Sequence, residues 1–131
     1  MEGFVQGKVK YLLRAEGLTV LFVTVFMYSH FDFSWLTFFI FFFFPDLSFF
    51  AYLKGAKVGA VFYNLVHSYI GPLICLMIGF VGSIELFQII TLIWVAHIGF
   101  DRALGYGLKY SQGFSYTHLG VIGKEKVPHH F

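Results

Sequence analysis

The stretch "WLTFFIFFFFPDLSFFAYL", residues 35–53, decides the fold of this chain. It is nearly solid phenylalanine, and crossing a bilayer takes about 20 mostly apolar residues. Phenylalanine lies on all sides of the predicted helix, so some faces contact lipid and others pack against protein. Pro45 and Asp46 interrupt the run. Because proline removes a helix hydrogen bond, we expect a bend there, either a simple packing kink or a place where freed backbone lines a cavity.

The composition of the whole chain also indicates a membrane protein. Its 131 residues allow one domain. They are 58% hydrophobic and 12% charged, with a mean hydropathy of +0.75. A soluble domain has about 25% charged residues, because it needs a polar shell. The formal net charge of +2, without a basic run, gives no reason to expect a nucleic acid partner.

Four stretches are long enough to span a membrane, and they predict an all-α, polytopic membrane protein. The connections between them are short, so successive spans should be sequential antiparallel neighbours. Residues 1–107 are therefore predicted to form an antiparallel four-helix transmembrane bundle, and residues 108–131 a tail. The predicted spans are about 10–28, 34–53, 58–80 and 84–106.

The positive charges predict the orientation of this bundle. All nine Lys and Arg residues fall at one set of predicted helix ends. By the positive-inside rule, both termini, the tail and the connection at residues 54–57 face the cytoplasm, and the protein is integral to the cytoplasmic (inner) membrane. The nine residues are Lys8, Lys10, Arg14, Lys54, Lys57, Arg102, Lys109, Lys124 and Lys126.

Ionisable side chains recur at a similar depth in the predicted spans. Each costs on the order of 2.5–3.5 kcal/mol inside a membrane, so their presence needs an explanation. Counting inward from the basic ends, at about 1.5 Å per residue, places them roughly 10–15 Å deep, the last slightly shallower. Each of the four helices would thus contribute to one polar layer. The residues are Glu16, Asp46, His67, His97 and Asp101.

Helical spacing brings several of these side chains onto shared faces. His97 and Asp101 are four residues apart and lie on one face of the fourth helix. Asn64 and His67 are three apart and share a face of the third, where Tyr63 is also within reach. Glycines near the fourth helix allow neighbouring segments to approach closely, namely Gly99, Gly105 and Gly107.

The favoured interpretation of this layer is a metal centre. Imidazole and carboxylate ligands suit Zn, Mn or Fe, and helix bundles often hold metals with such side chains. The predicted ligands are His67, His97, Asp101 and Asp46, with Asp46 and Glu16 as catalytic groups, Glu16 being a further ligand or the general base. A water on the metal could attack an ester or phosphoester of a membrane lipid, which makes the protein a metal-dependent hydrolase. The predicted substrate-binding residues are Arg102, Arg14, Asn64, Tyr63 and His118.

Three other functions remain open on the sequence. Two metals with oxygen could oxidise a lipid or isoprenoid. A non-enzymatic membrane subunit could use the polar layer only to hold its helices together. A proton-coupled carrier would need the path to continue through the outer half. A homodimer is a further prediction, because four short spans offer little room to enclose a lipid alone.

The motif string resembles an uncharacterised family of short bacterial integral membrane proteins, a domain of unknown function. The resemblance rests on "FFPDLSFFAYLKGAKVGAVFYNLVHSYIGP", "HIGFDRALGYGLKY" and "THLGVIG", and it covers roughly residues 10–123. It implies four spans and no established activity. It therefore supports the predicted architecture and singles out the same polar residues, but it does not supply the chemistry.

Overall fold

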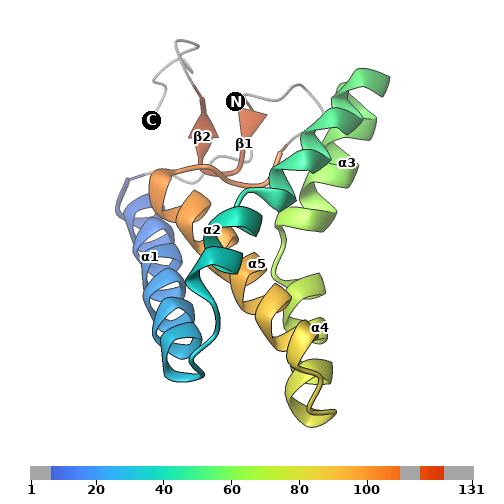
Figure 1. The fold of residues 1–131 in the computed structure, drawn as a ribbon. Coiled ribbons are helices and arrows are strands. Elements are labelled where there is room, and N and C mark those ends of the chain that lie inside the picture. Colours follow the sequence, from blue (N-terminus) through green and yellow to red (C-terminus); the bar gives the residue numbers. More distant parts are fainter. Residues whose placement is uncertain (1–6, 110–115, 123–131) are drawn as a thin grey trace.

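The computed structural model describes residues 7–109 and 116–122 (Figure 1). Four segments are long and apolar enough to cross a membrane, which confirms the predicted all-α, multi-pass membrane architecture. The first and last are the single helices α1 (Gly7–His30) and α5 (Glu85–Leu104). Each middle segment is divided in two. The second consists of α2 (Trp35–Phe41) and the 3₁₀ helix η1 (Phe44–Lys54), and the third of α3 (Ala56–His67) and α4 (Ile70–Val81).

Large apolar side chains cover the outside of these segments. Leu53 is 86% exposed, Val81 82% and Phe39 71%. In water, leaving a side chain of this kind unburied forfeits about 1.5–3 kcal/mol, so a soluble chain would bury it. Lipid removes this penalty, because its tails are as apolar as the side chains.

Two prolines set the breaks in the middle segments. A proline ring clashes with the carbonyl group four residues earlier and supplies no N–H group. Pro45 acts in this way on Phe41, where α2 ends, which confirms the predicted break. Pro72 acts on Ser68, which caps α3 with an extended ψ of 156°. The predicted third span, about residues 58–80, agrees with the membrane-spanning segment Ala56–Val81, and Pro72 adds a break within it that the sequence analysis did not predict.

The helices do not pack simply against the next helix along the chain. The main partner of α1 is α5, while η1 packs on α3 and α4 packs on α5. Figure 1 shows α1 beside α5, with α3 and α4 extending to the other side. Gly17 and Gly99 meet where α1 crosses α5, since a Cβ atom on Gly17 would lie 2.9 Å from the Gly99 carbonyl oxygen. The first two spans also meet, since the ring of Tyr28 on α1 lies 5.1 Å from the ring of Phe38 on α2, but the glycine contact makes α5 the main partner of α1.

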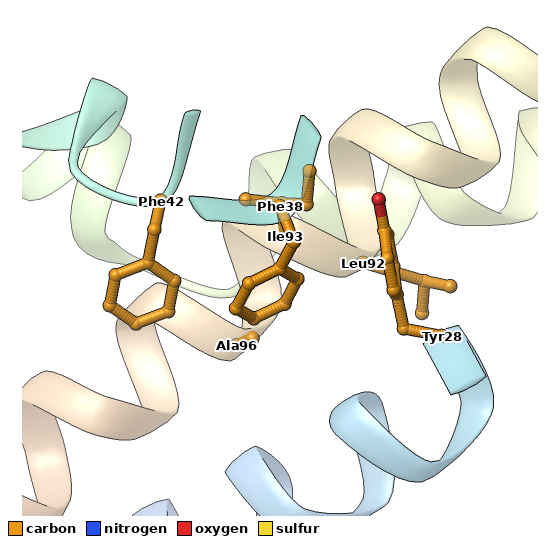
Figure 2. Close-up of a cluster of buried hydrophobic side chains, with 6 residues drawn as sticks. All are labelled: Tyr28, Phe38, Phe42, Leu92, Ile93 and Ala96. Carbon is orange, nitrogen blue, oxygen red and sulfur yellow. The ribbon is translucent and has the colours of Figure 1, made fainter. Parts of the chain in front are cut away.

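A buried apolar cluster joins α1, α2 and α5 (Figure 2). In Figure 2 the rings of Phe38 and Phe42 point from the second segment toward α5. The ring of Phe42 also packs against the ring of His97, with 5.3 Å between centroids. The cluster thereby borders the polar layer. Its members are Tyr28, Phe38, Phe42, Leu92, Ile93 and Ala96.

The C-terminal part of the chain folds back over one end of the helices. A hairpin of two short strands, β1 (Tyr116–Thr117) and β2 (Gly120–Val121), lies at the same end as the start of α1 and the η1–α3 connection (Figure 1). Lys109 pairs with Thr117 in an isolated antiparallel bridge. The basic helix ends lie together at this end, as expected for antiparallel spans joined by short connections. That this end faces the cytoplasm stays a prediction.

Candidate metal centre

Four side chains from three segments converge just inside the basic end. Asp46 comes from the start of η1, His67 from the last residue of α3, and His97 and Asp101 from α5. One potential ligand atom of each lies within 4.8 Å of all the others. Both proline breaks help, because they end α2 and α3 next to two of these residues. These are the four residues that the sequence predicted as ligands, and below they are called the His–Asp quartet.

Five of the six separations within the quartet are close to those of a tetrahedral metal site, and the sixth, between Asp46 and Asp101, is at most 4.8 Å. Asp46 Oδ1 lies 3.1 Å from Nε2 of His67 and 3.1 Å from Nε2 of His97. The two Nε2 atoms are 3.3 Å apart, and Asp101 Oδ2 lies 3.5 Å and 3.3 Å from them. Metal–ligand bonds of about 2.0–2.2 Å place the corners of a tetrahedron about 3.3–3.6 Å apart. A single ion between the four atoms therefore fits the observed spacing.

The backbone fixes which nitrogen of His67 faces the quartet. Its Nδ1 lies 3.0 Å from the carbonyl oxygen of Tyr63. A carbonyl can only accept, so Nδ1 carries the proton and Nε2 of the neutral ring presents its lone pair to the other three side chains. A backbone partner of this kind is typical of metal-binding histidines, because it orients the ring and sets the tautomer.

The charge balance also favours a cation inside the quartet. Two carboxylates and two imidazoles direct acceptor atoms at one another, and both histidines are buried. Lys109 and Arg102 lie close enough to interact electrostatically with Asp101, while the carboxylates of the quartet pair directly with its two histidines. A divalent ion balances the two carboxylates while both rings stay neutral. Nδ1 of His97 is buried and has no hydrogen-bond partner among the described residues, so this ring lacks the support that His67 has.

Tyr63 and Asn64 hold the C-terminal part of the chain against the quartet. The ring of Tyr63 stacks on His67 at 3.8 Å, with 5° between the planes. The amide of Asn64 pairs with the backbone of Lys109, donating to its carbonyl at 2.8 Å and accepting from its N–H at 2.6 Å. Asn64 was predicted to bind substrate or support His67. The structure instead uses both of its polar atoms to hold residue 109.

Arg102 closes the break in the third segment. One of its nitrogens donates to the carbonyl oxygen of His67 at 3.0 Å, and another lies 3.1 Å from Nε2 of His118. Trp94 donates to the neighbouring carbonyl of Val66 at 2.6 Å. The carbonyls left free at the end of α3 thus find donors on α5. Arg102 was predicted to hold a substrate phosphate or carboxylate, but much of its hydrogen-bonding capacity serves the fold.

Two basic side chains, Lys109 and, from the hairpin, His118, lie beside this region. Lys109 is buried, and its Nζ lies 4.9 Å from the centre of the Tyr63 ring. Burial lowers the pKa of Lys109 to about 8, against the opposing charges of Asp101 and Asp46. The backbone N–H of Leu108 donates to Nδ1 of His118 at 2.9 Å. Burial and the Arg102 charge lower the pKa of His118 to about 4, so this ring is neutral near pH 7.

We expect the hairpin to detach more readily in weak acid. A detached His118 has an ordinary pKa of about 6.5, whereas docking lowers the pKa to about 4. Docking is therefore strongest above about pH 6.5 and weakens as the pH falls toward about 4, by about 1–2 kcal/mol for this partly exposed ring. Hydrogen exchange of residues 116–122, corrected for intrinsic rates, should be about tenfold faster at pH 5 than at pH 7.5. A His118→Gln variant should lose most of this difference. Equal pH dependence in both proteins would contradict the assignment.

The two residues of the predicted site that come from α1, Glu16 and Arg14, also lie outside the quartet. Glu16 is exposed on α1, so its assignment as a ligand is corrected: the quartet is built from three segments and α1 adds nothing to it. The reason is that Gly17 faces α5, and its neighbour Glu16 points about 100° away. Arg14, three residues before Gly17, lies toward α5, and its Nε donates to the carbonyl oxygen of Ala103 at 3.0 Å. This bond caps the end of α5.

Sequence reasoning missed several residues that build the site. Pro72 and Trp94 shape and satisfy the end of α3, Gly17 admits α5, and Lys109 approaches Tyr63. Pro72 carried a usable signal, because proline breaks a helix four residues upstream. The other three depend on contacts between segments far apart in the sequence.

The chain belongs to the family described as a domain of unknown function (DUF4260), which it matches over residues 10–122. The resemblance to an uncharacterised family of short proteins is thereby confirmed. No curated protein and no solved structure matches the chain.

Proposed function

We propose that this member of the DUF4260 family is a membrane-embedded, metal-dependent hydrolase that acts on an ester or phosphoester of a membrane lipid. The observation that carries the proposal is the His–Asp quartet, whose four ligand atoms lie within 4.8 Å of one another in the membrane-spanning part of the chain. Ionisable residues at such depth are costly and usually mark a functional site.

The chemical types of the four ligands limit which metal ions the quartet could bind. Two imidazoles and two carboxylates suit Zn, Mn or Fe, whereas a site for Ca or Mg would present only oxygen atoms. A divalent cation here would supply Lewis acidity toward a carbonyl or phosphoryl oxygen. Access is on the side of Asp46, whose side chain is 43% exposed while that of His97 is fully buried.

Asp46 is the residue best placed to handle a proton. Hydrolysis consumes one water: its hydroxyl bonds to the acyl or phosphoryl centre, the bond to the leaving oxygen breaks, and the remaining proton passes to that oxygen. Both histidine contacts of Asp46 run through Oδ1. Its other oxygen can accept the proton from water and return it to the leaving group. Glu16, the alternative general base, has less support, because its side chain is exposed on α1.

The other functions have weaker support. The residues that the structure describes contain one group of potential ligands, so a di-metal oxidase would need ligands from elsewhere. A carrier would need a polar path past the apolar cluster of α1, α2 and α5. A purely structural role for the quartet is the main alternative, and it predicts a protein that folds without metal and hydrolyses nothing.

The proposal is tested by reconstituting the protein in lipid nanodiscs, stripping it with a chelator and restoring Zn, Mn or Fe one at a time. Release of fatty acid or phosphate from the nanodisc lipids is then measured. We expect metal-dependent turnover in the wild type and a loss of at least about 100-fold in His67→Ala. Stoichiometric metal without hydrolysis of any ester or phosphoester lipid would overturn the hydrolase proposal, and absence of bound metal would overturn the metal centre as well.

A further inference from the structure

A large apolar groove begins beside the His–Asp quartet. It has a volume of about 950 Å³, in the range of pockets that hold small ligands, about 300–1,000 Å³. Its walls come from α2, η1, α3 and the first half of α5. Pro45 and Val66 line it, and each directly precedes a member of the quartet, Asp46 and His67. The quartet itself is not part of the lining, so the groove runs along the segments that carry the quartet and ends one residue short of two of its members.

The walls offer an occupant almost nothing but apolar surface. The hydroxyl of Ser48 donates to the Pro45 carbonyl at 2.8 Å, and the indole N–H of Trp94 donates to Val66. These two polar groups of the lining are thus already used within the chain. Phenylalanine, leucine and isoleucine side chains make up much of the rest. Thr37 is the remaining polar residue of the lining, so the groove suits a hydrocarbon chain far better than a polar ligand.

The order of features along α5 matches the order of groups in a lipid. The groove follows α5 from Leu86 to Trp94, the quartet lies at His97 and Asp101, and the basic end follows. A lipid in the leaflet at that end has its tail deepest, then its ester bond, then its headgroup. A second copy of this chain would fill the groove without using the polar site beside it, so this ordering favours a lipid.

We propose that the groove binds one acyl chain of an ester lipid from the leaflet at the basic end and presents its ester bond to the quartet. This inference rests on the proposed function and specifies its substrate class: a long-chain amphiphile whose reactive group lies near Asp46. Because bulk lipid is as apolar as the groove, the walls contribute shape rather than hydrophobic attraction. They hold the chain in one direction, so that its polar end reaches the site.

The test uses an ether-linked lysophospholipid with a photoreactive diazirine midway along its chain. The ether replaces the acyl ester, so binding is read without cleavage of the ester bond that the groove would present. The full protein in nanodiscs is irradiated with this probe, and labelled peptides are mapped, with and without excess unlabelled ether lipid. We expect competable labelling within residues 44–51 and 86–94.

A matched pair of variants separates the groove from the general lipid surface. Ile90 lines the groove and is 50% exposed, whereas Ile74 on α4 is 52% exposed and is not part of the lining. Ile90→Trp should reduce competable labelling by about tenfold, because an indole displaces roughly ten carbon–carbon contacts of the chain. Ile74→Trp should leave it unchanged. Labelling spread over the outer faces of all helices, equal in both variants, would overturn the groove.

Metal content measured on the same samples shows whether the groove proposal or the metalloenzyme proposal has failed. Groove labelling in a protein that binds no metal would support the chain site and reject the metalloenzyme. Metal-dependent hydrolysis that is unaffected by Ile90→Trp would leave the enzyme and reject the groove as its substrate site. Cross-links from the groove to a second copy of the chain, in place of lipid labelling, would also overturn the inference.

Discussion

Replacing His97 with alanine is expected to lower the affinity for a divalent metal by at least about a hundredfold. Structural metal sites with four protein ligands provide about 10–16 kcal/mol, or about 3 kcal/mol per ligand if shared equally, and about 1.4 kcal/mol is a factor of ten. His97 is fully buried, so water has little access to replace its Nε2. The measurement is metal content by mass spectrometry, after stripping and reloading the protein in detergent.

His30 provides a control for this substitution. It is the last residue of α1, is exposed, and lies at the end of the helices opposite to the basic one. His30→Ala should therefore bind as much metal as the wild type. If His97→Ala keeps its helical circular dichroism but loses metal, the structural alternative fails, because the quartet is then not needed for folding. Equal metal content in both variants would remove His97 from the site.

Replacing Gly17 with valine is expected to destabilise the protein by about 2–3 kcal/mol, since overpacking a close helix contact costs about this much. A Cβ atom at residue 17 would lie 2.4 Å from Cβ of Arg102 and 2.9 Å from the backbone nitrogen of Ala103. Neither atom can move unless α5 shifts away from α1. The measurement is the midpoint of thermal unfolding in detergent.

Ala15→Val is the matched control for this prediction. Ala15 is exposed on α1, so a larger side chain there meets lipid or detergent instead of α5. Its midpoint should stay near that of the wild type. The shift of α5 in Gly17→Val should also weaken metal binding, because α5 carries two of the four ligands. Similar midpoints for Gly17→Val and Ala15→Val would show that the α1–α5 contact is looser than described.

The sequence predicted the site better than it predicted the packing around it. The spacing of four residues brings His97 and Asp101 together on any α-helix, and their ion-pair contacts with Asp46 and His67 follow from a shared depth. Depth cannot distinguish a side chain that faces the bundle from one that faces lipid. Glu16 was predicted at the same depth but is exposed and lies outside the quartet, because its neighbour Gly17 is the residue of α1 that meets Gly99 on α5.

Helical periodicity also could not predict the hydrogen-bond partners of the polar side chains. Asn64 lies one turn from His67, yet its amide reaches Lys109, 45 residues later. Arg102 turns to the carbonyl of His67 because Pro72 ends α3 there. In both cases the side chain bonds a backbone group that has no partner within a helix.

The sequence by itself determined that this protein has four membrane-spanning segments, that proline interrupts the second, and that His and Asp residues lie at one depth. It could do so because hydropathy, proline geometry and rise per residue are local properties. Only the tertiary structure decided that α1 packs on α5, that three segments rather than four supply the quartet, and that an apolar groove opens beside it. These features depend on which faces of distant segments meet, and in a membrane that choice follows from close packing at small residues rather than from hydrophobicity.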